Sequence, residues 1–262
     1  MDASDEAAIW VRVQDEAQRL ISEEPVLAAF ARAAILDNKN IAEGLAHILS
    51  CHVADATIGV SQFRDILLSI YAESPALGRS AALDLNAIIA RDPAAPDILT
   101  PFLYFKGFHA LQTYRAAHWL WTKGRRDLAS YLQHRTSILY GVDIHPAARL
   151  GTGILFDHAT GIVIGETAVV EDEVSMLHGV TLGGTGKEKG DRHPKVRRGV
   201  MIGAGSAVLG NIEIGEGASV AAGSVVLKDV PPHVTVAGVP AQIVGKPKSE
   251  TPSTEMDQTL PE

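Results

Sequence analysis

Four polar positions in the second half of the chain combine residue types that can move protons or bind ions. They are Asp143 in VDIHPAA, Asp157-His158 in LFDHATG, His178 in MLHGVTLGG, and Arg192-His193 in GDRHPK. A carboxylate that holds one ring nitrogen of a histidine fixes its tautomer and stabilises its cation, as a general base for a hydroxyl requires. Asp143 and His158, fifteen residues apart, are candidates for such a pair. The alternative is that His158 is an ordinary surface residue.

The stretch GGTGKEKGDRHPK, residues 183–195, is rich in glycine and in cationic side chains. From residue 183 to 198, six lysines and arginines face two acids, an excess of +4 in a chain of net charge −8. Such an excess favours an anion nearby. The alternative is a solvated insertion without a ligand.

These positions interrupt a repeat of six residues that starts after residue 141. Large apolar side chains recur at every sixth position, with a two-residue shift after Ile162 and a gap at 183–195: Ile144, Leu150, Phe156, Ile162, Ile164, Val170, Met176, Leu182, Val196, Ile202, Val208, Ile214, Val220 and Val226. The pattern predicts a parallel β-helix whose short strands point these side chains into a shared core. The hexad resembles that of left-handed β-helices, an exception to the right-handed crossover rule. Three hexads per coil place Asp143 and His158 on neighbouring coils.

The first half of the chain has a helical period instead. Apolar residues fall on one helical face in segments such as Ile9, Val13 and Ala17. The breaker RDPAAPD, residues 91–97, separates helices because its prolines cannot continue one. Thr100-Pro101 is predicted to begin a long helix, with Thr100 as the N-cap.

We therefore predict an α+β fold with an N-terminal all-helical domain followed by a left-handed parallel β-helix. The expected boundaries are 1–140 for the helical domain, 141–247 for the β-helix with its extruded loop at 183–195, and 248–262 for a polar C-terminal tail.

Composition limits the classes of function. An excess of 31 acidic over 23 basic residues makes the chain a poor candidate for binding nucleic acid or an anionic membrane. No stretch approaches 18 apolar residues, and the N-terminus lacks the features of a signal peptide. The single cysteine, Cys51, cannot form an internal disulfide. We expect a reduced, cytoplasmic protein without nucleic-acid or membrane partners.

Ten histidines in the chain raise the question of a zinc site. The γ-type carbonic anhydrases, which share this repeat, bind zinc through three histidines, two of them five residues apart on the β-helix. The β-helix histidines here, at positions 145, 158, 178, 193 and 233, include no such pair. His47 and His52 have this spacing but lie in the helical half, so no metal site is expected.

Two motifs, DHATG at 157–161 and GDRHPK at 190–195, closely resemble those of the serine O-acetyltransferases. The resemblance includes RDPA at 91–94 and TPFLYFKGFHALQTYRAAHWLW at 100–121, and it extends to about residue 247. It implies acetyl transfer from acetyl-CoA to the hydroxyl of L-serine, giving O-acetyl-L-serine and CoA. This is the first step of cysteine biosynthesis from serine.

The resemblance also implies a role for each site residue. It makes His158 the general base and Asp143 its partner. It assigns the other positions to ligands: Asp92 and Asp157 to the serine ammonium, Arg192 and His193 to the serine carboxylate, and Gly184, Ala204 and Ala222 to acetyl-CoA. Acetyl-CoA is then a co-substrate and no cofactor is bound permanently. His178 receives no role and is expected to be structural.

The resemblance further implies feedback inhibition by L-cysteine and a homotrimer or a dimer of trimers joined through the helical halves. Family members that bind O-acetylserine sulfhydrylase do so through a C-terminal isoleucine, whereas this sequence ends in Leu-Pro-Glu. Binding to that enzyme is therefore doubtful. A hexapeptide acyltransferase with a sugar or xenobiotic acceptor and a non-catalytic scaffold remain as alternatives with the same fold.

Overall fold

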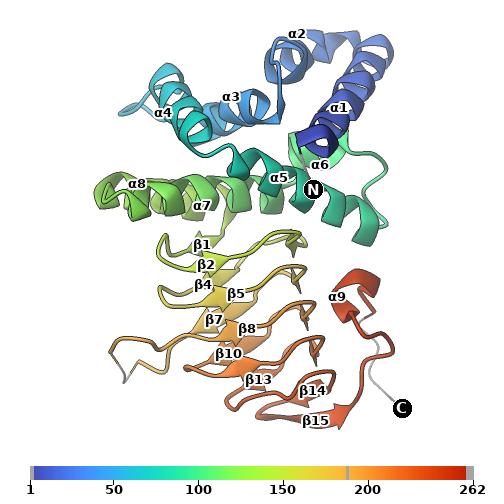
Figure 1. Cartoon of the computed structure of the whole chain (residues 1–262), viewed down its shortest axis with the longest axis vertical. Coiled ribbons are helices and arrows are strands. Elements are labelled where there is room, and N and C mark those ends of the chain that lie inside the picture. Colours follow the sequence, from blue (N-terminus) through green and yellow to red (C-terminus); the bar gives the residue numbers. More distant parts are fainter. Residues whose placement is uncertain (1–2, 187–188, 258–262) are drawn as a thin grey trace.

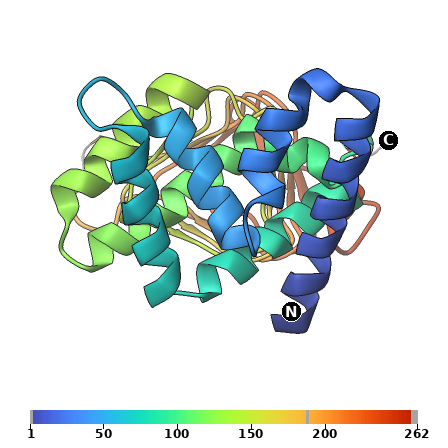
Figure 2. The same ribbon diagram turned by 90° about the horizontal axis from the view of Figure 1, so that it is seen from above.

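The computed structural model describes residues 3–186 and 189–257 of the chain. The helices of residues 3–140 lie together at one end of the molecule, and short strands form a prism-shaped stack of coils beneath them (Figure 1). Seen from above, the helices cover the end of this prism (Figure 2). The architecture is the predicted one, an α+β fold with a left-handed parallel β-helix.

The helical half packs its elements around one apolar core. The elements are α1 (Ala3–Glu23), a 3₁₀ turn η1 (Pro25–Leu27), α2 (Ala28–Ala31), a π-helical turn η2 (Arg32–Leu36), α3 (Ile41–Val53), α4 (Val60–Glu73), α5 (Ala76–Arg91), α6 (Leu99–Tyr104), α7 (Lys106–Thr122) and α8 (Arg126–Tyr140). Leu45, Phe63 and Phe102 are fully buried in this core. Gly141, in the left-handed region at φ 66°, ends α8 and turns the chain toward the first strand.

The start of α6 differs from the prediction. The helix begins at Leu99, and Thr100 is not its N-cap. The N–H of Thr100 instead donates to Oδ1 of Asp97, at 2.8 Å. An acidic side chain three residues earlier therefore satisfies a free amide of the first turn.

The long helix predicted after Thr100 is also divided, at Phe105. The backbone of Phe105 is extended, with φ −80° and ψ 106°. A continuous helix would pair the carbonyl of Phe102 with the N–H of Lys106. That carbonyl accepts a hydrogen bond from Nε2 of the buried His109 instead, at 2.8 Å. Lys106 consequently starts a new helix, α7.

The strands are short and build three parallel sheets. They are β1 (Asp143–Ile144), β2 (Arg149–Leu150), β3 (Leu155–Phe156), β4 (Val163–Ile164), β5 (Val169–Val170), β6 (Ser175–Met176), β7 (Thr181–Gly183), β8 (Lys195–Val196), β9 (Met201–Ile202), β10 (Ala207–Leu209), β11 (Glu213–Ile214), β12 (Ser219–Val220), β13 (Val225–Val226), β14 (Thr235–Gly238) and β15 (Ala241–Gly245). The sheet orders are β1-β4-β7-β10-β13, β11-β8-β5-β2 and β15-β14-β12-β9-β6-β3. Only the last pairing of the described strands, β14 with β15, is antiparallel.

The length of each coil shows where the repeat is irregular. A regular coil takes 18 residues, as between the paired Val163 and Thr181. The first coil takes 20, from Asp143 to Val163, because the corner between β3 and β4 is longer. The coil from Thr181 to Ala207 takes 26, because the loop between β7 and β8 is extruded. Both irregular corners hold candidate site residues.

A buried ion pair joins the helical half to the first coil. Asp84 of α5 is fully buried and accepts hydrogen bonds from Gln112 and Arg115 of α7, the latter at 2.8 Å. Its Oδ1 also accepts from the Ile154 N–H, at 3.0 Å. Arg115 Nη2 donates in turn to the carbonyl of Gly151, at 2.8 Å. The pair thus satisfies backbone groups of the β-helix from within the helical half.

A second buried arginine lies at the end of α5. Arg91 is 6% exposed and donates to the carbonyl of Gly153 at 3.0 Å and to Oγ of Ser175 at 3.1 Å. It also forms an ion pair with Glu173. Ser175 Oγ donates onward to the carbonyl of Ser253, at 2.9 Å.

The polar tail therefore contacts the same junction between the end of α5 and the β-helix. The short helix α9 (Pro252–Glu255) lies beside the strands (Figure 1), and Ser253 is fully buried. The terminal residues 258–262, on which the doubt about sulfhydrylase binding depends, lie outside the described residues. No helix within 3–186 or 189–257 is long and apolar enough to cross a membrane.

Removing the charge of Asp84 should destabilise the protein strongly. Asp84→Asn leaves the Arg115 guanidinium buried without a counter-ion, which we expect to lower the free energy of unfolding by about 3–5 kcal/mol. Chemical denaturation at one protein concentration measures the change. Glu73→Gln, which breaks the exposed pair with Lys123, is the control and should cost less than about 1 kcal/mol. Equal effects of both variants would contradict the role of Asp84.

Candidate functional site

A cavity of about 410 Å³ opens at the seam between the two halves. Both halves line it: the helical half contributes Asp92, Tyr104 and Lys106, and the β-helix contributes Phe156, Asp157 and His158. Three of the predicted site residues, Asp92, Asp157 and His158, thus meet in one place.

Asp92 is presented by the end of α5. Its N–H still donates to the carbonyl of Ile88, at 2.8 Å, but its own backbone is extended and Pro93 follows. Its Oδ1 accepts from the N–H of Ala94, at 2.8 Å, which closes a tight local turn. Because the preceding residue is the anchored Arg91, the carboxylate is held at the seam.

His158 is presented by the lengthened corner between β3 and β4. His158 and Ala159 both adopt left-handed backbone conformations, with φ of 54° and 59°. Consecutive non-glycine residues in this region are strained, and such strain is common at functional sites. The turn leaves the His158 side chain 81% exposed, with Nε2 3.9 Å from Oδ1 of Asp157.

The backbone at the start of α7 packs directly against the backbone of β3, next to this corner. Gly107 lies in the first turn of α7, and a Cβ atom at this position would collide with the carbonyl oxygen of Phe156. Only glycine therefore fits here, and the start of α7 is held against the end of β3.

The electrostatics of the cavity favour a cationic ligand beside Asp157. Burial raises the pKa of this carboxyl group above its usual value, His158 opposes the shift, and the negative charge of Asp92 adds to it. Two carboxylates that repel each other in a half-buried site are both stabilised when an ammonium group lies between them.

Asp143 is placed differently from the expectation. Its Oδ1 accepts a hydrogen bond from Nε2 of Gln133 in α8, at 2.7 Å. No hydrogen bond or ion pair within the described part of the chain joins Asp143 to His158. The carboxylate that lies nearest to the His158 ring by a recorded contact is Asp157, not Asp143.

Arg192 and His193 lie at another corner of the prism. Arg192 pairs with Glu166, at 2.8 Å, and His193 Nδ1 lies 2.8 Å from Oγ1 of Thr167. His193 is 7% exposed, and its ring fills the space next to Gly165. Burial, followed by the charge of Arg192, lowers its pKa. This corner follows β4 and β7, whereas the His158 corner precedes β4, so one chain does not bring the two groups together.

The three positions assigned to acetyl-CoA are divided between the same two corners of the prism. Ala204 and Ala222 follow β9 and β12, on the edge of the prism that also carries His158 and His178. A column of left-handed glycines runs along this edge, formed by Gly161, Gly179, Gly205 and Gly223. A Cβ on Gly179 would lie only 3.2 Å from the Cα of Gly205. Gly184 lies at the other corner, against the Arg192 backbone.

Sequence reasoning missed the contribution of Lys106 and the position of His178. Lys106 lines the cavity because the helix breaks at Phe105, and the predicted continuous helix gave no reason to single it out. The His178 ring lies 6.2 Å from the His158 ring, one coil further along the same edge. The two histidines are 20 residues apart, which is the offset between the paired Leu155 and Ser175, whereas a regular coil of three hexads would have placed Met176 next to His158.

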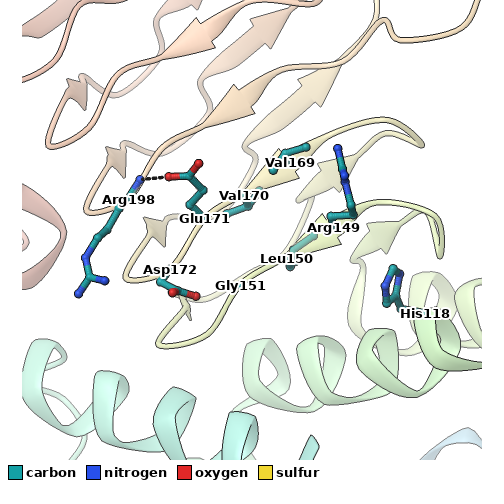
Figure 3. A pocket seen from close by; sticks show the side chains of 9 residues that line it. All are labelled: His118, Arg149, Leu150, Gly151, Val169, Val170, Glu171, Asp172 and Arg198. Carbon is teal, nitrogen blue, oxygen red and sulfur yellow. Dashed lines mark hydrogen bonds between the residues drawn. The ribbon is translucent and has the colours of Figure 1, made fainter. Parts of the chain in front are cut away.

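A second cavity, of about 640 Å³, lies on the sheet that contains β2 and β5 (Figure 3). Arg149 and Arg198 lie at its two ends, with Glu171 and Asp172 between them. Glu171 is already held by Arg197 and by the Arg198 N–H, and Asp172 by Thr152. None of the predicted site residues lines this cavity. Among the described residues, no three His, Cys, Asp or Glu side chains are arranged to share a metal ion.

Comparisons with known proteins agree with the geometry. The model of the N-terminal region of serine acetyltransferases matches residues 9–113, and that of six bacterial transferase hexapeptide repeats matches residues 193–228. The serine acetyltransferase of Salmonella typhimurium is 55% identical over 250 residues, which are 95% of this chain and 92% of that protein.

Two solved structures are similar over nearly the whole chain. A serine acetyltransferase in complex with cysteine has a TM-score of 0.95 and 50% identity, and the match covers 97% of this chain and 98% of the other. The Brucella abortus serine acetyltransferase in complex with coenzyme A has a TM-score of 0.90 and 51% identity, covering 91% and 96% of the two chains.

Proposed function

The chain belongs to the serine acetyltransferase family, and we propose that it transfers the acetyl group of acetyl-CoA to the hydroxyl of L-serine beside His158. The observation that carries the proposal is the meeting of Asp92, Asp157 and His158 at one cavity of a chain from this family. Two carboxylates and an accessible imidazole suit an acceptor that has both an ammonium group and a hydroxyl.

His158 is the general base. Its exposed ring takes the proton of the serine hydroxyl while the oxygen attacks the thioester carbonyl, and it then returns the proton to the departing sulfur. General acid–base catalysis of this kind contributes about 10² to 10⁴ in rate. Asp143 orients the ring in the complex with substrates, where catalytic hydrogen bonds that are absent in the free enzyme often form. For this it must exchange its bond to Gln133.

The polar ends of serine are bound by groups of opposite charge. Its ammonium lies between Asp92 and Asp157, whose mutual repulsion it relieves. Its carboxylate binds Arg192 and His193. Because these two lie at the other corner of the prism, they come from a neighbouring protomer.

A homotrimer supplies that neighbour. The sheet β1-β4-β7-β10-β13 connects the two corners; Val163 in its strand β4 is 40% exposed, and Leu227, directly after β13, is 50% exposed. Three copies that pack these sheets around a threefold axis place the His158 edge of one beside the loop of the next. Exposed apolar side chains of the helical half, such as Val26 at 84% and Ile138 at 61%, are candidate contacts for a dimer of trimers.

Acetyl-CoA lies in the groove between two protomers, as a co-substrate rather than a permanently bound group. Ala204 and Ala222 line one wall, where the glycine column leaves the edge free of side chains. Gly184 of the neighbouring loop lies on the other wall. The thioester then approaches His158 along the edge.

L-Cysteine inhibits the enzyme by occupying the serine site. It differs from serine by one atom, so that the same acids and cations bind its charged groups. The similarity to a serine acetyltransferase solved with cysteine supports this assignment.

Thiol release from acetyl-CoA, followed with a panel of amino-acid and sugar acceptors, tests the function. We expect turnover with L-serine and little with sugars. His158→Ala should lower kcat by about 10² or more while acetyl-CoA still binds. Asp143→Asn should cost less, since it disturbs orientation only. Near-normal turnover of folded His158→Ala would contradict the assignment.

Mixed trimers test whether the site is shared. His158→Ala and Arg192→Ala should each be nearly inactive alone. When the two are co-expressed in equal amounts, random trimers rebuild about one quarter of the sites, because one protomer supplies His158 and its neighbour Arg192. No regain of activity in isolated mixed trimers would place the whole site in one chain.

Isothermal titration tests the inhibitor site. L-Cysteine should bind the wild-type protein, compete with serine, and lose its binding in Arg192→Ala. Cysteine binding that survives in this variant and leaves serine affinity unchanged would indicate a separate regulatory site.

A further inference from the structure

One cationic side chain at the proposed site, that of Lys106, takes no part in the mechanism above. Lys106, the first residue of α7, lines the cavity together with Asp92, Asp157 and His158. Its Nζ donates a hydrogen bond to Oγ1 of Thr160, two residues beyond His158. The ammonium group therefore lies over the turn that presents the proposed base.

The charge of Lys106 is not neutralised. No salt bridge among the described residues includes this lysine, and its recorded hydrogen-bond partner is a neutral hydroxyl. Its side chain is half-buried. The other ionisable groups that line the cavity are the imidazole of His158, the phenol of Tyr104 and the carboxylates of Asp92 and Asp157. Lys106 thus adds a positive charge that can be directed at a ligand.

The anchor of Lys106 is rigid. The N–H of Thr160 donates to the carbonyl of His158 at 2.7 Å, and the carbonyl of Thr160 accepts from the N–H of Gly179 at 2.8 Å. Gly107, which follows Lys106, is held against Phe156 by the absence of a Cβ. A cation fixed in this way needs no reorganisation when a negative charge forms next to it, which is the condition for strong electrostatic catalysis.

Acetyl transfer creates such a charge. A lone pair of the serine oxygen forms a bond to the thioester carbon while the hydroxyl proton moves to His158, and the carbonyl electron pair moves to its oxygen. When this tetrahedral intermediate collapses, the carbonyl re-forms and the carbon–sulfur bond breaks. The sulfur leaves with the bonding pair and receives the proton from His158.

The other charged groups already have partners in this scheme. The serine ammonium occupies Asp92 and Asp157, the hydroxyl faces His158, and the carboxylate faces Arg192 and His193. The carbonyl oxygen, which becomes negative next to the serine oxygen that faces His158, has no cationic partner in this scheme. Lys106 is the lining cation that remains.

We propose that Lys106 is a further catalytic residue, whose ammonium donates a hydrogen bond to the acetyl carbonyl oxygen as it becomes an oxyanion. The proposal rests on the proposed transfer to serine. Loss of one such donor typically lowers kcat by about 10² to 10³.

The test compares Lys106→Met and Lys106→Arg with two further variants by thiol release. Lys106→Met should lose about 10² or more in kcat, with KM for serine changed by less than about threefold. Lys106→Arg, which keeps the charge, should recover part of this loss. Thr160→Val removes the anchor that holds the ammonium in place but keeps its charge, so it should lose only part of the kcat that Lys106→Met loses. Lys123→Met is the control. Lys123 follows the opposite end of α7 and does not line the cavity, so this variant should keep full activity.

Three results would overturn the proposal. An unchanged kcat in Lys106→Met would remove Lys106 from catalysis. A raised KM for serine with kcat retained would make it a carboxylate ligand instead. Equal losses in Thr160→Val and Lys106→Met would make it only a support for the turn. Acetyl-CoA binding by titration shows that each variant is folded, and inactivity of the wild-type protein with serine would instead reject the proposed function.

Discussion

The buried ion pair between Asp84 and Arg115 is the contact on which the rest of the structure depends. A β-helix must cover its first coil, because the backbone groups and apolar side chains at that end have no preceding coil to pair with. Here Asp84 accepts from the Ile154 N–H and Arg115 donates to the Gly151 carbonyl, so charged groups of the helical half close the end. Arg91 contributes to this closure by donating to the carbonyl of Gly153. Since Asp92 directly follows Arg91, this closure also positions a carboxylate of the candidate site.

The site itself arises from departures from regularity. The two additional residues before Val163 create the left-handed turn that exposes His158. Eight additional residues between β7 and β8 allow the chain to bring Arg192 and His193 back against Glu166 and Thr167, which follow β4. The single regular coil between these insertions, from β4 to β7, sets the separation of the two groups.

The proposed assembly follows from this spacing. The two sets of polar residues lie at opposite ends of the same strands, so the proposed function requires that each chain contribute two half-sites, one on either side of the sheet β1-β4-β7-β10-β13. In the proposed trimer, burying that sheet also joins each half-site to its complement, and catalysis becomes a property of the assembled protein. The proposed trimer would also give acetyl-CoA a groove with walls from two protomers.

The amino-acid sequence by itself determined the two periods, the coil core and the identity of the polar residues. These depend on local patterning: burial at every sixth position is decided by the residue there, and DHATG and GDRHPK are continuous motifs. Only the tertiary structure decided the contacts between segments that are distant in the sequence. The hydrogen bond of Gln133 to Asp143, the bond of Lys106 to Thr160 and the helix break at Phe105 depend on how α7 and α8 pack on the first coil. No local pattern encodes that packing, because it results from close approaches such as that of Gly107 to Phe156 between chain segments about fifty residues apart.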